Sequence, residues 1–134
     1  MIKTGGPVDA SSMQQLLFVG RSLNMTLTTD QALSKMAAGT NYVVTKVVAV
    51  RKTGAFGTAC AGGVYTATAK GGSALVAAGQ SYANLTGAGK IVDATVAAVN
   101  GTDAQSAATL YLSLTTGNTG ALTADVFVYG TIID

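Results

Sequence analysis

The chain has 134 residues, of which 49% are hydrophobic and 10% charged, and its eight Lys/Arg and six acidic residues give a net charge of +2. It has no histidine, which excludes Ser-His-Asp and Cys-His catalytic machinery, and its single cysteine cannot form a zinc site of the Cys/His type. The basic residues are scattered rather than clustered, and no apolar run approaches the length of a membrane span. We therefore expect a non-enzymatic domain without cofactor or metal, and with no nucleic-acid or membrane partner.

The surface of such a chain is thinly charged. A free globule of this size exposes about 6,500 Å² by the usual scaling of area with mass. The eight basic and six acidic residues make fourteen charges for that area. Large uncharged surfaces commonly mark contacts with other proteins, so we expect much of this surface to face other subunits.

Residues 1–15 predict an N-terminal arm, followed by a single domain over residues 16–134. The arm contains Gly5, Gly6 and the only proline, Pro7, and lacks the apolar stretch of a signal peptide. We expect it to lie extended against a neighbouring subunit, with Ile2, Val8 and Met13 as its buried contacts. On this interpretation the protein is made in the cytosol and used there, or leaves the cell as part of a particle.

Alternation of apolar and polar residues dominates the rest of the chain and predicts half-buried strands. The stretch 42–50 is apolar on both faces, which indicates a central or interfacial strand. Glycine-rich segments separate the strands and mark turns. The predicted strands cover residues 22–28, 42–50, 63–69, 91–99, 109–115 and 125–129.

One short helix is predicted between the first two of these strands. Thr28 and Gln31 have the spacing of a capping box, and Gly39 is a suitable helix end. Between them, Leu33 and Met36 would share one face. The predicted fold is therefore all-β: a single antiparallel β-sandwich of seven or eight strands, jelly-roll-like, with this helix and the N-terminal arm. Edge strands of such a fold need covering, which again favours packing of subunits.

Groups that could carry chemistry have simpler structural interpretations. A catalytic pair of carboxylates would need two of the dispersed aspartates to converge, and Asp30 is expected in the first helical turn. Cys60 is expected to be buried and inert. Residues 86–91 resemble the end of a phosphate-binding loop but lack its first glycine and its Ser/Thr. Residues 100–103 offer too few ligands to hold calcium by themselves.

Aromatic residues suggest a contact surface. If the strands that carry Tyr111 and Phe127 pair, then Tyr111, Phe127 and Tyr129 cluster opposite the aliphatic core face. Ordinary cross-strand packing would explain such a cluster. A subunit contact is the alternative explanation, because Tyr and Phe are enriched in interfaces.

Three segments carry a resemblance to a known group of proteins. They are the Ala-Gly-Gly-Val-Tyr-Thr run at 61–66, the Leu-Tyr-Leu-Ser-Leu-Thr-Thr run at 110–116 and the Ala-Asp-Val-Phe-Val-Tyr-Gly run at 124–130. Together they resemble small structural proteins encoded in the morphogenesis regions of tailed bacteriophages, over roughly residues 22–132. The shared patterns are strands and turns, and no catalytic residue is carried over with them.

The resemblance implies a β-sandwich or jelly-roll protein of the virion, most simply a decoration or cement protein on the capsid surface. Its partners would then be the major capsid protein and further copies of itself, with a homotrimer favoured over a dimer because capsid lattices offer threefold positions. The protein would be synthesised in the host bacterial cytoplasm. The alternative is a tail, fibre or vertex component that acts as a receptor- or carbohydrate-binding module.

Overall fold

The computed structural model describes residues 14–54, 57–86, 90–97 and 103–134. Ile2, Val8 and Met13 lie outside these described residues. The described part contains eight strands and a short 3-10 helix, η2 (Ala83–Thr86). The strands are β1 (Gln15–Asn24), β2 (Gln31–Lys35), β3 (Tyr42–Gly54), β4 (Ala61–Ala67), β5 (Gly71–Val76), β6 (Ile91–Ala94), β7 (Leu110–Thr116) and β8 (Leu122–Ile132).

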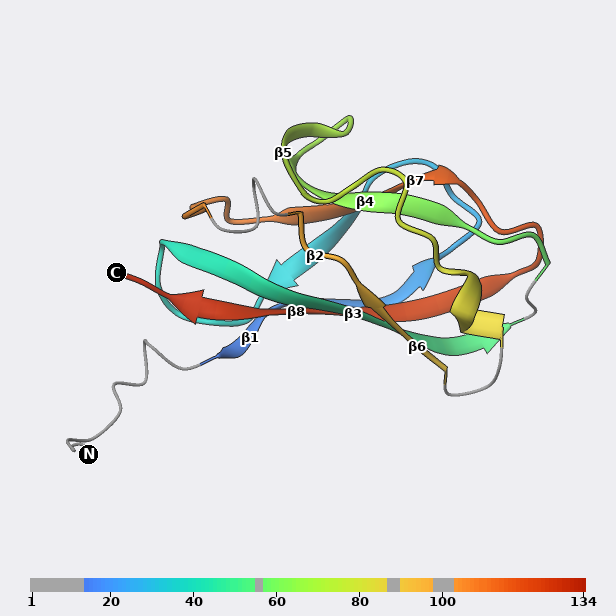
Figure 1. Ribbon diagram of the computed structural model, residues 1–134, viewed down its shortest axis with the longest axis horizontal. Helices are drawn as coiled ribbons and strands as arrows, with labels where there is room; N and C mark the ends of the chain where they lie inside the picture. The colour runs from blue at the N-terminus through green and yellow to red at the C-terminus, as the bar shows by residue number, and fades with distance from the viewer. Residues whose placement is uncertain (1–13, 55–56, 87–89, 98–102) are drawn as a thin grey trace.

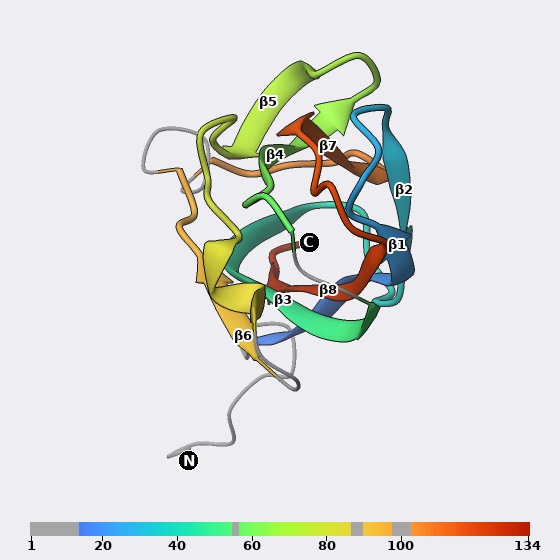
Figure 2. The ribbon, with the colours of Figure 1, turned by 90° about the vertical axis from the view of Figure 1, so that its right-hand side faces the viewer.

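All eight strands belong to one antiparallel sheet in the order β5-β4-β7-β2-β1-β8-β3-β6. The sheet curls, so that the half formed by β5, β4 and β7 lies across from the half formed by β1, β8, β3 and β6 (Figures 1 and 2). Strand β2 joins the halves, because it pairs with β1 on one side and with β7 on the other. The all-β, antiparallel fold is thereby confirmed, whereas the two-sheet sandwich and the jelly-roll connection remain predictions.

The core fills the space between the two halves. Strand β8 shows how the sequence places it: buried and half-buried residues alternate without interruption from Leu122 to Ile132. Phe18 of β1 and Tyr42 of β3 meet edge to face, with ring centroids 5.4 Å apart. Buried side chains also come from the opposite half, including Leu110, Leu112 and Leu114 of β7. The predicted alternation over 109–115 and 125–129 is therefore confirmed.

The predicted helix between residues 28 and 39 is wrong, because the chain forms strand β2 there. The Gln31 side chain does not cap a helix. Its amide accepts a 2.7 Å hydrogen bond from the backbone N–H of Asn24 and donates one of 2.8 Å to the carbonyl of Asn24. Leu33 is buried between exposed Ala32 and Ser34, which is the two-residue period of a strand. Pairing with β1 and β7 thus overrides a local helical pattern of only two or three turns.

The strand predicted over 91–99 is shorter than expected, because β6 ends at Ala94. After it, Thr95 N–H donates to the side-chain oxygen of Gln80 at 2.9 Å. The chain then crosses to the other half, where Val96 forms a bridge with Val76 at the end of β5. Ala97 N–H adds a 2.8 Å hydrogen bond to the carbonyl of Leu75.

This crossing brings together the two edges of the sheet. Strand β5 is the first strand in the sheet order and β6 the last, and the segment after β6 pairs with the end of β5. Unpaired edges are sites where another chain can add a strand. The chain's own backbone therefore covers part of the β5 edge, and the expectation that subunit packing covers the edges stays a prediction. Contacts with other molecules are more simply made through the faces of the sheet.

Gln14 and Gln15, which the sequence assigned to the arm, belong with the sheet. Gln15 pairs with Gly130 of β8, and the Gln14 side chain accepts a 3.0 Å hydrogen bond from the Thr45 hydroxyl. Among the described residues, no helix has both the length and the apolar character needed to cross a membrane.

Candidate interaction surface

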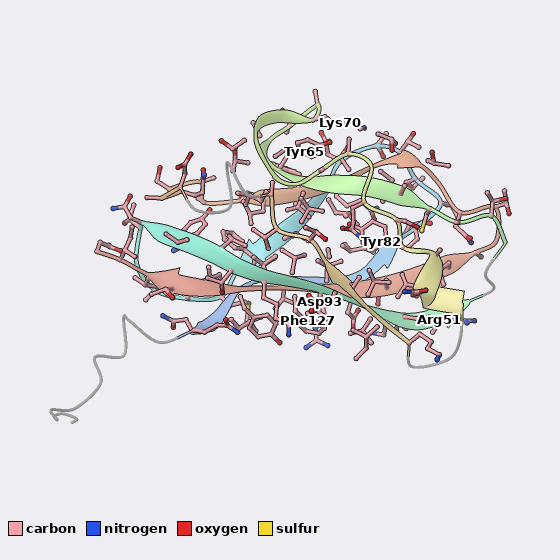
Figure 3. All side chains as sticks on the ribbon, in the orientation of Figure 1. Arg51, Tyr65, Lys70, Tyr82, Asp93 and Phe127 are labelled. Carbon is pink, nitrogen blue, oxygen red and sulfur yellow. The ribbon has the colours of Figure 1, made fainter. Side chains whose placement is uncertain are left out.

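The outward side of β1, β8, β3 and β6 carries a row of apolar side chains. We call it the outer face. Phe127 and Asp93 mark it in Figure 3, where both lie on the side of the molecule opposite Tyr65 and Lys70. The outer face consists of Leu16, Val19, Arg21, Lys46, Val48, Val50, Ile91, Asp93, Asp125, Phe127 and Tyr129, which the strand register and burial pattern place on one side.

Strand register places these residues in rows that run across the sheet. Phe127 lies opposite Val19 on β1 and Val48 on β3, and Val48 lies opposite Asp93 on β6. The next row contains Val50 beside Ile91, which is 57% exposed. Cross-strand neighbours stand close enough for direct side-chain packing. The middle of the outer face is therefore a continuous apolar strip.

A β-bulge directs Arg21 onto this strip. The register of β1 against β8 shifts between Gly20 and Leu23, and Ser22 takes a positive φ of 50°. Its N–H donates a 2.7 Å hydrogen bond to Asp125, whose carboxylate also lies 3.7 Å from the Arg21 guanidinium. The guanidinium in turn lies 5.6 Å from the centre of the Phe127 ring, a cation–π arrangement.

The second charged pair on the outer face joins Lys46 of β3 and Asp93 of β6. Their charged atoms are 3.8 Å apart and both side chains are largely exposed. Exposed ion pairs of this kind stabilise a fold little, typically by about 0–1 kcal/mol. These pairs therefore do more to set the electrostatic character of the outer face than to hold the sheet together. Each pair combines one positive and one negative charge.

The predicted aromatic cluster does not form. Phe127 and Tyr129 are both on the outer face, but Tyr111 is on β7, which pairs with β2 and β4 rather than with β8. Tyr111 lies opposite Tyr65 of β4 and Ala32 of β2. The premise that these two strands pair is wrong, because β2 and β1 stand between them in the sheet.

Sequence reasoning missed the aliphatic members of the outer face. The signal was present in residues 42–50, where apolar residues occupy both faces of the predicted strand. Such a strand can be covered on both sides within its own domain or can present one side to a partner. Val48 and Val50 turn out to be half-buried on the outward side, opposite Phe127 and Asp125.

A second cluster of polar groups that could take part in chemistry lies around Ser113 of β7. Ser113 has no solvent exposure, and its hydroxyl accepts a 2.9 Å hydrogen bond from the Lys70 ammonium. Lys70 also donates to the carbonyl of Thr28 at 3.2 Å. The backbone N–H of Ala69, followed by the hydroxyl of Ser113, lowers the pKa of Asp30 below its usual value. Asp30 therefore lies just before β2, against the β4–β5 turn, and not in a helix.

This cluster does not have the arrangement of a nucleophilic serine with its base. A general base must accept the hydroxyl proton, whereas the Lys70 ammonium donates a hydrogen bond to the Ser113 oxygen. Ser113 is also sealed from solvent, so no substrate can reach it without a rearrangement. The cluster is better explained as a hydrogen-bonded contact that joins β7, the β4–β5 turn and the segment before β2.

Other reactive groups are enclosed by the fold. Cys60 is free and buried, and burial raises the pKa of its thiol, which makes the reactive thiolate less accessible. The Tyr82 hydroxyl is buried and donates to the carbonyl of Gly62 at 3.1 Å. Over the described ranges, no three Asp or Cys residues come together as a possible metal site.

Comparison with known proteins returned no matching family model, no matching curated protein and no matching solved structure.

Proposed function

We propose that this chain is a structural subunit of a virus particle, most simply a decoration protein that clamps neighbouring major capsid subunits. The observation that carries the proposal is the outer face, an apolar strip on a sheet whose edges are joined by its own chain. A rigid domain with one apolar face can add contacts across subunit joints, and the Val76–Val96 bridge limits strand addition at the end of β5.

Composition supports the same proposal. The chain carries few charges for its size, and apolar surface without charge favours association over life as a free monomer. The resemblance of residues 61–66, 110–116 and 124–130 to small virion proteins points in the same direction. Ser113 is hydrogen-bonded to Lys70, and Cys60 is buried. Both groups therefore support a structural role better than a catalytic one.

The proposal is tested by quantitative mass spectrometry of particles purified from the source of this sequence. We expect the protein in a fixed stoichiometric ratio to the major capsid protein. Particles stripped of it should lose their DNA at lower temperature, and adding back the purified chain should restore their resistance. A variant with Val48→Lys on the outer face should restore less than one with Ala32→Lys, which places the same charge on an exposed site of β2.

Two results would contradict the proposal in different ways. A few copies per particle would exclude a decoration role and favour the tail, fibre or vertex component, which binding of the isolated chain to host cells or glycans would then test. Absence from particles altogether would exclude a structural place in the virion.

A further inference from the structure

We propose that residues 1–13 of one copy bind the outer face of a second copy of this chain, with Ile2, Val8 and Met13 against the apolar strip around Phe127. This inference goes beyond the proposed function, because it concerns association between copies and holds in whatever assembly they form. It identifies the surface that receives the arm.

The receiving surface is suited to an extended segment. Its strip crosses the sheet from Val19 through Phe127 and Val48, and continues in the next row to Val50 and Ile91. Two charged pairs, Arg21–Asp125 and Lys46–Asp93, lie on and beside the strip, with the Arg21 guanidinium over the Phe127 ring. Both signs of charge are therefore present at its borders. The arm also carries one charge of each sign in its side chains, at Lys3 and Asp9.

The arm begins at one end of this same face. The Gln14 side chain accepts the 3.0 Å hydrogen bond from Thr45 of β3, and Leu16 lies opposite Tyr129. Strand β1 then runs away from this point toward Val19 and Arg21. Gln15 already lies opposite Gly130, so the described part of the chain enters this face at Leu16.

The position of Gln14 favours the face of a neighbour over the chain's own face. To cover its own Phe127, the arm would have to reverse direction immediately before Gln14, which the hydrogen bond to Thr45 anchors. A neighbour placed beyond this end of the sheet receives the arm without any reversal. Thirteen residues span at most about 43 Å when extended, at roughly 3.3 Å each. A domain of this length has a radius of gyration of about 14 Å, so the arm is long enough to cross one neighbouring copy.

Thiol cross-linking tests the position of the arm directly. In a Cys60→Ala background, one preparation carries Val8→Cys and the other carries Val48→Cys. A short bifunctional maleimide reagent is then added to the mixture. We expect a covalent dimer of twice the 13.3 kDa chain mass. The matched control replaces Val48→Cys by Ala32→Cys, an exposed site on β2 outside the outer face, and should give at least about tenfold less dimer.

A chain that carries both Val8→Cys and Val48→Cys distinguishes the two locations of the arm. Cross-linking within a single chain would overturn the proposal, since the arm would then bind its own domain. Equal dimer yields at residues 48 and 32, or no dimer at all, would overturn it as well.

Sedimentation equilibrium supplies an independent measurement that needs no cross-linking. We expect the full chain to self-associate, and deletion of residues 1–13 to raise the dissociation constant at least tenfold, which corresponds to about 1.4 kcal/mol. Val48→Lys should weaken association by a similar factor, and Ala32→Lys should not. Circular dichroism verifies that each variant is folded. A full chain that stays monomeric up to the highest soluble concentration would contradict the proposal.

Discussion

The ammonium group of Lys70 donates a 2.9 Å hydrogen bond to the hydroxyl of Ser113, a side chain with no solvent exposure. The two residues are 43 positions apart, and the contact ties the turn between β4 and β5 to β7. Lys70 reaches Ser113 from a turn in which both Ala69 and Lys70 have positive φ angles, of 58° and 57°. Left-handed backbone costs a residue with a side chain roughly 1–2 kcal/mol. The hydrogen bond between Lys70 and Ser113 therefore forms although the turn that carries Lys70 is strained.

Replacement of Lys70 by methionine should destabilise the fold. The variant Lys70→Met keeps much of the aliphatic stem but leaves the buried Ser113 hydroxyl and the Thr28 carbonyl without this donor. A buried polar group that loses its partner typically costs about 1–3 kcal/mol. Urea denaturation followed by circular dichroism measures the change in the free energy of unfolding. Lys52→Met, at an exposed position of β3, is the matched control and should change it by less than about 0.5 kcal/mol. Equal effects would show that this hydrogen bond contributes nothing.

The strain in the turn can be separated from the contact of the Lys70 side chain. Ala69→Asn and Lys70→Asn both place a residue that tolerates left-handed backbone at a position with positive φ. Ala69→Asn keeps the backbone N–H that donates to Asp30 at 2.7 Å, and should stabilise the fold by about 0.5–1 kcal/mol. Lys70→Asn relieves the same strain but removes the ammonium group, and should destabilise the fold. Similar changes in the urea midpoint for both variants would contradict the role of the Lys70 side chain.

Gly130 of β8 has no room for a side chain. A Cβ atom there would overlap the carbonyl oxygen of Val43 on the paired strand β3, and would also meet Leu17. Because the opposing atom is backbone, Gly130→Ala requires the two strands to separate, and should cost about 1–3 kcal/mol or more. Gly79→Ala is the control, since nothing lies within 4 Å of its Cβ position and its φ is not positive. It should be neutral or stabilise by up to about 1 kcal/mol. Thermal unfolding of the two variants measures this contrast.

Stability should fall at alkaline pH because tyrosines are buried. Burial raises the pKa of Tyr42 from 10.0 to about 12, and raises that of Tyr82 as well. Between pH 10 and about 12 the folded protein therefore holds a proton at Tyr42 that the unfolded chain has released. The stabilisation is complete below pH 10 and is lost as the pH rises through the higher value. Urea midpoints measured from pH 9 upward should decline less steeply in Tyr42→Phe than in the unsubstituted chain.

The Tyr42→Phe variant has a separate cost at neutral pH, because it removes the 2.7 Å hydrogen bond from the Tyr42 hydroxyl to the carbonyl of Ala107. The slope of stability against pH is therefore the informative quantity, and an unchanged slope would contradict the prediction. Tyr111→Phe is the matched control, since Tyr111 is only half-buried on the outward side of β7.

Two carboxylates should make the fold sensitive to acid. The pKa of Asp134 is lowered by the backbone N–H groups of Thr40 and Asn41, and that of Asp30 by the N–H of Ala69. For a lowered pKa, the stabilisation is present above the ordinary value of 3.8 and is lost as the pH falls through the lower, folded-state value. Asp134→Asn should flatten the acid limb of the stability profile, most clearly at low ionic strength. Asp103→Asn, at an exposed position, should leave the acid limb unchanged.

Alternation along the chain predicted β3, β4, β6, β7 and β8, but the first strand predicted at 22–28 is wrong because β1 covers Gln15–Asn24, and β5 was not predicted. It is unbroken in β8 and clear in β7, and there the buried residues are those that the two-residue period assigns to the core. The physical reason is local, because successive side chains of a strand point to opposite sides of the sheet. The apolar and polar residues of a half-buried strand therefore show which side faces the core. The burial of Cys60 was predicted from its residue type, because a free cysteine usually behaves as a small hydrophobic residue.

The candidate site depended on strand order, which alternation does not encode. Tyr111 and Phe127 both lie on outward sides, yet they are apart because β2 and β1 come between their strands. The strand pairing of β2 replaced a local helical pattern, and Gln31 bonded to Asn24 of β1 rather than to its own segment. Long-range pairing outweighs a local preference of this size, because a helix of two or three turns is marginal without tertiary contacts.

The sequence by itself determined an all-β chain without histidine chemistry, since residue types and the period of two are properties of the chain alone. Only the tertiary structure decided that the segment after β6 joins the edge of β5, and that Val19, Phe127 and Val48 form one row. Both depend on which distant segments become neighbours when the sheet curls over its core. That choice is made by the packing of the whole domain, because each local segment is compatible with several partners.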